Sequence, residues 1–443
     1  MEAIDIDEEH RGNINAMIDI EKLIQKQSTA LNEELESLIP LSDMYNSIYR
    51  VPKRLRELNE KAYTPQVVSI GPLHYGTDKL MPMEEHKRRY LQEFLRRSEA
   101  NNMSDYITII KANEEKLRNS YAEEIRLRSD EFVKMILVDA AFIIEILLKS
   151  KFRNLQRNDR IFTKPWMIAD IMFDMCLLEN QLPFFILEEL FEGAYVSIGT
   201  RDDNKSPMIK LIHDFTKDSW DFSKIEDNLE NKSFDRVEHL VDFLSICLVP
   251  SETDRPRKMR LGTLTTPTVT ELHQAGVKFQ QVYNKSLFEI KFNGVSGVLE
   301  IPHLKVVKET ELLFRNLLAF EQCHGTTNCI NDFVVLINHL VNTPKDVDLL
   351  IQFGIIENWL PDSVGVSTLF HNLVKETSII PGNFYFSLLV EDMNTYCRTP
   401  WHRWKATLKQ DYFRNPWTGI SVLAAIVLLG LTFIQTVYSV LKK

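Results

Sequence analysis

The sequence has few cysteines, and it lacks the short motifs that identify common cofactor and catalytic sites. Its five cysteines are odd in number and irregularly spaced, which does not indicate a disulfide framework and favours a reducing compartment. No GxxxxGKS, GxGxxG or HExxH motif occurs in the 443 residues. The acidic N-terminus, MEAIDIDEEH, has no apolar core of a signal peptide, so none is predicted. No cofactor is predicted either.

The chain also lacks the excess of positive charge that nucleic-acid binding requires. It has 52 Lys and Arg against 62 Asp and Glu, a net charge of −10. Phosphate binding needs a basic surface that releases counterions, so this balance argues against a nucleic-acid partner. Two local basic runs, in residues 48–56 and 86–90, are interpreted as solvated faces.

Two short stretches have the residue types of a reactive site but not the spacing. QCHGTTNC contains Cys323, His324 and Cys329, but a zinc site needs a fourth ligand at a recognisable spacing. We interpret this stretch as a loop between two helices. GVSG, residues 294–297, lacks the G-x-S-x-G spacing of a nucleophile elbow. No metal or nucleophile site is therefore predicted.

Three carboxylates in apolar surroundings are the strongest candidates for chemistry. Asp139 and Glu145 lie within MILVDAAFIIEILL, and Glu179 lies within LLENQLPFFILEEL. One hypothesis is a set of general acids and bases with raised pKa values. The other is a structural network in which these acids meet Arg50, Arg54 or Arg315, because a buried carboxylate is costly without a partner. No nucleophile or cofactor motif accompanies the acids, which favours the structural network.

The triplet that contains Glu179 is followed closely by a proline. Pro183 cannot donate a backbone hydrogen bond, and its ring would crowd the carbonyl of Glu179. We therefore predict a helix that is kinked at Pro183. The side chains of Glu179, Asn180 and Gln181 would bind the backbone groups that the kink releases.

An uncharged apolar run near the C-terminus predicts a transmembrane helix. It extends from Ile420 to Val440, and Trp417 and Tyr438 stand at its borders as membrane-interface residues. The separation of the two aromatic residues corresponds to roughly 31 Å of helix, which matches a bilayer core. Ser421 and Ala425 form a small-xxx-small pair, a weak sign of self-association.

The charges that flank this run predict its orientation. Four basic residues precede it between positions 403 and 414, and only Lys442 and Lys443 follow it. The positive-inside rule places the main domain in the cytosol. With no signal peptide, the run would act as a tail anchor in the endoplasmic reticulum or the plasma membrane.

The predicted fold class is mainly α, a multi-helix globular domain with a small β-hairpin and one C-terminal transmembrane helix. Residues 1–40 form an acidic helical extension, 41–415 the main domain and 416–443 the anchor. Residues 67–76 are predicted to form a short strand before a turn, and 286–306 the hairpin. Helices are predicted over 14–38, 81–97, 106–118, 130–150, 309–323, 329–342, 364–375 and 386–412, the fourth with Ser129 as its N-cap.

Nine ordered segments between Tyr49 and Thr436 resemble a plant family known as domain of unknown function 247. They include YRVPKRLRELNEKAYTPQVVSIGPLHYG, HKRRYLQEFL, VDAAFIIEILL, LLENQLPFFILEEL, TVTELHQAGVKF, LEIPHLKV, FRNLLAFEQC, DVDLLIQFGIIEN and the C-terminal segment from Trp404. The resemblance implies a membrane-associated plant protein with no established catalytic activity, some of whose relatives act in pollen self-recognition. We therefore expect a non-catalytic recognition or interaction protein, with an enzyme that uses the buried carboxylates as the alternative.

Overall fold

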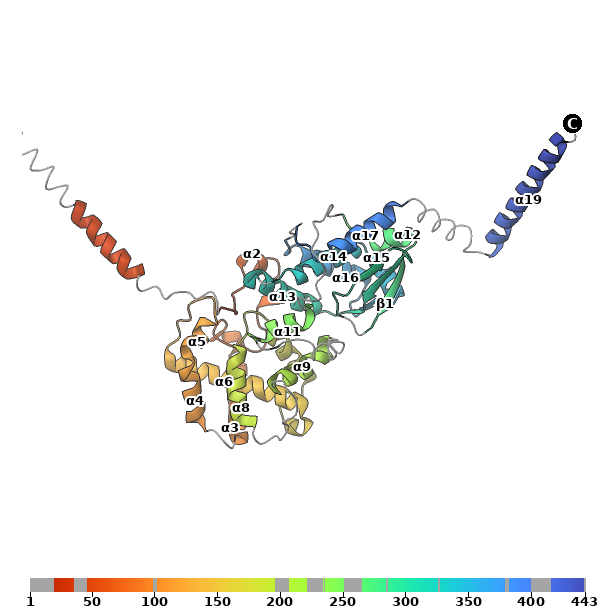
Figure 1. The fold of residues 1–443 in the computed structure, drawn as a ribbon. Helices are drawn as coiled ribbons and strands as arrows, with labels where there is room; N and C mark the ends of the chain where they lie inside the picture. The colour runs from red at the N-terminus through yellow and green to blue at the C-terminus, as the bar shows by residue number, and fades with distance from the viewer. Residues whose placement is uncertain are drawn as a thin grey trace, which may run out of the picture. The chain divides into compact units, whose positions relative to one another are not determined.

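The fold comes from a computed structural model (Figure 1). It describes residues 20–35, 46–98, 102–195, 207–220, 234, 236–250, 265–283, 286–325, 327–378, 382–399 and 416–441. The chain divides into two units, Met1–Asn46 and Ser47–Lys443. The first unit contains a helix over residues 20–35, whose side chains are all exposed.

The regular elements described in the first half of the second unit are all helices. Its elements are α2 (Lys53–Arg56), η1 (Glu60–Tyr63), η2 (Asp78–Leu80), α3 (Met81–Arg97), α4 (Met103–Ala112), α5 (Glu114–Asn119), α6 (Ser129–Lys151), η3 (Arg153–Gln156), α7 (Pro165–Met175), α8 (Phe184–Tyr195), α9 (Pro207–Trp220) and α11 (Leu240–Leu248).

The second half adds short strands to the helices. Its elements are α12 (Val269–Gln274), β1 (Lys278–Val282), β2 (Lys291–Asn293), β3 (Val298–Pro302), β4 (Leu304–Val306), α13 (Thr310–His324), α14 (Cys329–Leu340), α15 (Pro344–Gln352), β5 (Ile356–Asn358), α16 (Ser363–Val374), α17 (Ser387–Arg398) and α19 (Pro416–Leu441).

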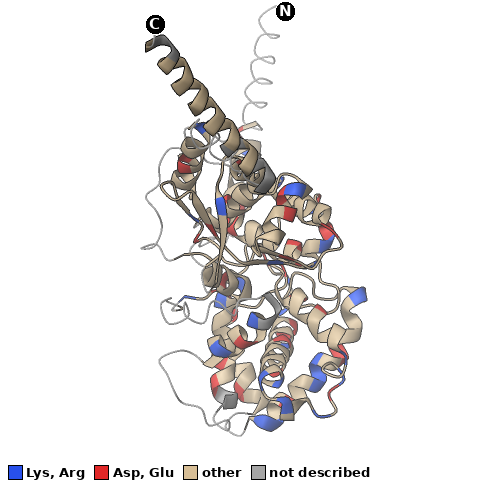
Figure 2. Cartoon of the chain, turned by 90° about the vertical axis from the view of Figure 1, so that its right-hand side faces the viewer, with Lys and Arg blue, Asp and Glu red and all other residues tan. Residues whose placement is uncertain are grey.

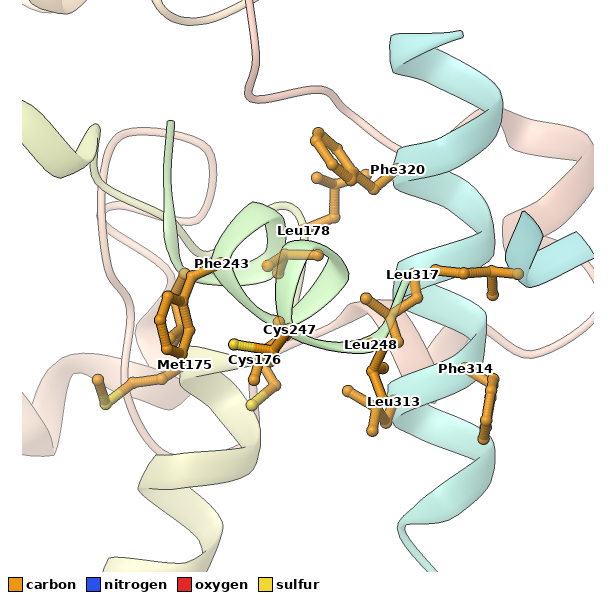
Figure 3. Packing of buried hydrophobic residues seen from close by; sticks show 14 of the residues in the cluster. Met175, Cys176, Leu178, Phe243, Cys247, Leu248, Leu313, Phe314, Leu317 and Phe320 are labelled. Atoms are coloured by element: carbon orange, nitrogen blue, oxygen red, sulfur yellow. The ribbon is translucent and has the colours of Figure 1, made fainter. Parts of the chain in front are cut away.

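Helix α6 is the centre of the helical half because it is apolar almost all round. It is buried from Phe132 to Lys149 except at Lys134, and it packs against α3, α4, α8 and α9. Helix α13 joins this half to the strand-bearing half, since it contacts η1 and α11 as well as α14 and α16. Figure 3 shows this core, in which side chains of α13 face side chains of α11 and of the chain after α7.

The strands form two small sheets. In the first, β3 lies between β1, which is parallel to it, and β2, which is antiparallel to it. In the second, β4 pairs with β5 in parallel, with Leu304 opposite Ile356. The β2–β3 pair turns through Asn293–Val298 and is the hairpin that the sequence predicts.

The mainly helical class and the hairpin are thus confirmed, and most of the differences concern helix boundaries. The helix predicted over 106–118 is two helices, α4 and α5, which meet at Asn113. Helix α6 has Arg128 at its N-cap position, and the Ser129 hydroxyl hydrogen-bonds Glu114 instead. The helix predicted over 386–412 is described as α17 up to Arg398, and residues 400–415 lie outside the described chain.

The predicted C-terminal transmembrane helix is wrong. A helix does form there, α19, but none of the helices in the described part of the chain is long and apolar enough to cross a membrane. In its second half, the hydroxyls of Thr432 and Thr436 donate to the carbonyls of Leu428 and Thr432 within the same helix. The interface role predicted for Trp417 and Tyr438 depended on this span. Tyr438 is exposed on α19, and the Trp417 side chain lies outside the described residues.

Candidate functional site

The segment Gln66–Gly71 forms no strand, and side chains rather than a second strand bind its backbone. Asp174 accepts hydrogen bonds from the N–H groups of residues 66, 67 and 68, at 2.8, 2.6 and 2.9 Å. Asn180 accepts from Ile70 N at 2.7 Å and donates to Val68 O at 3.0 Å. The prediction of a strand over 67–76 is therefore wrong, because no strand in the described chain pairs with these residues.

Glu179 is the most heavily engaged of the predicted acids. Its Oε1 accepts from Val51 N at 2.7 Å and also binds Arg56. Its Oε2 lies 3.5 Å from Arg50 Nη1 and 3.1 Å from His74 Nε2. Burial would raise the pKa of this carboxyl, but His74 and Arg56 hold the pKa below its ordinary value. Glu179 is thus an ionised anchor for the residues around Arg50 and His74.

Asp139 and Glu145, both on α6, pair with two basic residues of α3. Asp139 Oδ1 lies 2.5 Å from the buried Lys87 Nζ, and Oδ2 accepts from Gly71 N at 2.9 Å. Glu145 receives two hydrogen bonds of 3.0 Å from the Arg97 guanidinium. Burial raises the pKa of both carboxyls, and their basic partners oppose the shift. Each predicted acid therefore has its own partners, and the three do not face one substrate site.

The basic partners differ in part from those that the sequence predicts. Arg50 does approach Glu179, but Arg54 hydrogen-bonds Gln322 at 2.6 Å. Arg315, only 2% exposed, pairs with Glu376 and with Glu311. It joins a second buried network, in which Tyr63 Oη donates to Glu376 at 2.9 and 3.0 Å.

The predicted helix kink at Pro183 is wrong, because no helix passes through this residue. Helix α7 ends at Met175 and α8 begins at Phe184, so Pro183 directly precedes a helix, where its missing N–H costs least. The amides of Asn180 and Gln181 bind the carbonyls released at the end of α7. Asn180 donates to Asp174 O at 2.9 Å, and Gln181 donates to Met175 O and Leu177 O at 2.6 and 2.7 Å.

Sequence reasoning missed Asp174 and Asn316, two further side chains that bind backbone from distant segments. Asn316 accepts from Leu178 N at 2.9 Å and donates to Ala62 O at 2.7 Å. Burial raises the pKa of Asp174 to about 6, against the effect of the three N–H groups that it accepts. The signal for Asp174 was present, since PWMIADIMFDM surrounds it with apolar residues much as α6 surrounds Asp139.

QCHGTTNC spans the end of one helix and the start of the next, in line with the predicted connection between two helices. Cys323 and His324 end α13, Gly325 has the left-handed conformation that closes it, and Cys329 begins α14. The Tyr49 hydroxyl lies 3.2 Å from His324 Nδ1. Among the described residues, no group of His, Cys, Asp and Glu side chains could hold a metal ion.

His239 is a buried histidine whose hydrogen bonds show which of its ring nitrogens carries the proton. Its Nε2 lies 2.9 Å from Ser47 O, and its Nδ1 accepts from Asp242 N at 3.2 Å as the N-cap of α11. A carbonyl only accepts and an N–H only donates, so the ring is neutral with its proton on Nε2. Burial lowers the pKa of His239 to about 3.

This histidine should make the fold sensitive to acid. Its pKa is lower in the folded chain than the ordinary 6.5, so the unfolded chain binds the proton first and stability falls as pH falls below 6.5. Between pH 6.5 and 5 we expect a loss of about 2 kcal/mol from this residue. Urea unfolding at several pH values would measure it.

The His239→Asn variant is the control, because asparagine can cap the helix but does not titrate. Asp174 and Asp242, whose pKa values are raised to about 6 and about 7, contribute with the opposite sign. They contribute in the same way in the variant and in the wild type, so their effect cancels when the two proteins are compared. Equal pH dependence of the variant and the wild type would contradict the assignment.

One exposed face of the strand-bearing half carries large aromatic side chains. We call it the β4–β5 face, formed by Tyr283, His303, Lys305, Glu357 and Trp359. Lys305 and Glu357 are partners in the strand register, so their side chains share a face with Trp359, two residues further along. Trp359 and Tyr283 are both 65% exposed.

Local contacts hold the β4–β5 face in one arrangement. Lys305 Nζ lies 4.6 Å from the centre of the Trp359 ring, and Trp359 Nε1 donates to Glu357 Oε1 at 2.6 Å. His303 Nε2 lies 3.3 Å from Glu357 Oε2, and Tyr283 stacks on His303. Elsewhere, Figure 2 shows acidic and basic residues interspersed along the helices rather than grouped by sign.

Comparison with known proteins identifies a family. The model described as a plant protein of unknown function, domain of unknown function 247, matches residues 48–431. A UPF0481 protein of Arabidopsis thaliana is 29% identical, with 89% of this chain and 86% of that protein covered. A putative UPF0481 protein of the same plant is 23% identical, with 92% of this chain and 92% of that protein covered. No solved structure matches the chain significantly. The resemblance predicted from the sequence is confirmed.

Proposed function

Because the chain belongs to the plant family of domain of unknown function 247, which assigns it no activity, we propose that it is a non-catalytic interaction protein that binds other proteins through the β4–β5 face. The observation that carries the proposal is the pair of exposed aromatic side chains, Tyr283 and Trp359, on a face ordered by its own contacts.

Aromatic side chains of this kind supply much of the binding energy in protein interfaces. Trp and Tyr bury a large area with few rotatable bonds, and they are enriched among the residues whose loss weakens binding most. Lys305 and Glu357 already hold Trp359, so less conformational entropy is lost when a partner covers it. A polar rim of Lys305 and Glu357 would provide specificity.

The buried carboxylates support the non-catalytic part of the proposal. Asp139, Glu145 and Glu179 are at most 1% exposed, and each is engaged by basic groups or backbone N–H groups. A general acid or base has to reach its substrate within hydrogen-bond distance. These acids instead tie segments of the fold together.

Proximity labelling in plant cells tests the proposal, with the full chain fused to the labelling enzyme. The Trp359→Ala variant should lose proteins that the wild type labels, since loss of one such aromatic residue weakens binding by about 2 kcal/mol, or roughly thirtyfold. Trp166→Ala is the matched control, because Trp166 is similarly exposed, at 58%, on α7. Both variants should retain the thermal stability of the wild type. Identical sets of labelled proteins for Trp359→Ala and the wild type would contradict the proposal.

A further inference from the structure

We propose that the helix over residues 20–35 pairs two copies of this chain as an antiparallel, two-fold symmetric helix pair. This inference is independent of the β4–β5 face. The helix belongs to the first unit of the chain, and every one of its residues is exposed there.

The helix carries an apolar stripe on one face near both of its ends, with Gln27 between the two apolar groups. Ile20, Ile24, Leu31 and Leu35 fall within roughly 60° of one another around the helix axis. Together with Leu23 beside them, these side chains are between 55% and 61% exposed. A helix this short, roughly 24 Å long, is marginal in water without packing against its apolar side. We therefore expect another apolar surface to pack against the stripe.

The spacing of the apolar residues fits a second copy of the same helix as the partner. Ile20 and Leu35 lie equally far from the point between Gln27 and Ser28, and so do Ile24 and Leu31. In an antiparallel pair centred on that point, Ile20 of one copy meets Leu35 of the other, and Ile24 meets Leu31. A two-fold axis requires this self-complementarity, because the same patch contacts itself. In the sequence outside the described helix, Met17 and Leu38 continue the symmetry.

The charges favour the antiparallel direction over the parallel one. The first half of the helix contains Glu21, Lys22 and Lys26 and has a net charge of +1. The second half contains Glu33 and Glu34 and has a net charge of −2. Antiparallel pairing sets the basic half against the acidic half, and it also opposes the two helix dipoles.

The oligomeric state of the full chain tests the pairing. Two short helices bury less area than a standard interface, so we expect a dissociation constant of about micromolar. Sedimentation equilibrium at tens of micromolar should therefore show a dimer of the 51.7 kDa chain. Ile24→Asp should weaken dimerisation more than about tenfold. Thr29→Asp, on the opposite face of the same helix, should not. A monomer at all concentrations would overturn the proposal and would favour a different protein, or the second unit of the same chain, as the cover of the stripe.

Disulfide trapping between copies tests the direction, with the wild-type chain and its native cysteines as the background. Gln27→Cys should cross-link to itself, and Ile20→Cys should cross-link to a differently tagged Leu35→Cys chain. Ile20→Cys alone should not, because its two copies would lie roughly 22 Å apart along the helix axis. Efficient self-cross-linking of Ile20→Cys would indicate parallel helices and overturn the proposal.

Discussion

Replacing Glu179 with glutamine should lower the free energy of unfolding by about 3 kcal/mol. The buried Oε1 atom binds Val51 N and Arg56, and Oε2 lies between Arg50 and His74. Glutamine has nearly the same shape but no charge, and one of its two terminal atoms is an N–H donor. The substitution therefore removes the counter-charge of two arginines and places a donor where an acceptor is needed. Urea unfolding of the purified chain would measure the loss.

Glu123→Gln is the matched control, because Glu123 pairs with the same arginine at the surface. Its Oε1 lies 2.7 Å from Arg50 Nη2, but its side chain is 40% exposed. Exposed ion pairs contribute about 1 kcal/mol or less, so this variant should be nearly as stable as the wild type. Similar losses for the two variants would contradict the anchoring role of Glu179.

The same experiment separates the two hypotheses for the buried acids. A catalytic Glu179 predicts a stable variant that has lost its biological activity, because catalytic groups are seldom needed for the fold. A structural Glu179 predicts a destabilised variant, because the substitution leaves buried partners unpaired. A variant with unchanged stability that fails to complement the wild type in the plant would favour the enzyme.

Local sequence patterns predicted the elements whose partners are near in the chain. Helix α3 has the predicted bounds, and the β2–β3 hairpin forms because its two strands are joined by one turn. The pairing of β4 with β5 could not be predicted in this way. Leu304 and Ile356 are neighbours in the parallel sheet, but α13, α14 and α15 separate them in sequence.

The partners of the buried acids likewise could not be predicted from local sequence patterns. The apolar neighbours of Asp139, Glu145 and Glu179 predicted their burial, because a carboxylate surrounded by apolar residues in the sequence has few ways to reach water. Their partners Lys87 and Arg97 depend on how α3 packs against α6, which the sequence pattern does not specify. The sequence of the segment Gln66–Gly71 likewise resembled that of a strand, but side chains from other parts of the chain bind its backbone. These side chains lie next to the segment only in the folded chain.

Replacing Gly71 with alanine should cost about 4 kcal/mol, the largest effect that we expect from one added methyl group. Gly71 has a φ of +72°, a conformation that favours glycine. A Cβ atom there would lie 2.5 Å from Gln181 O and 3.0 Å from Tyr121 Oη. Gln181 O itself accepts a 3.0 Å hydrogen bond from that hydroxyl, so neither atom can move away without breaking the other contact. The N–H of Gly71 also binds Asp139, and a shift of this backbone would disturb the Asp139–Lys87 pair.

Gly76→Ala measures the cost of the backbone conformation alone, without a close contact between the added methyl group and its surroundings. Gly76 has a similar φ of +78°, but a Cβ atom there would have nothing within 4 Å. Its replacement should cost only the conformational strain, about 1 kcal/mol. Urea unfolding of both variants should therefore show a difference of about 3 kcal/mol. Equal losses of stability in the two variants would mean that backbone strain alone accounts for the cost at Gly71. The backbone at Gln181 would then be able to move away from a side chain at position 71.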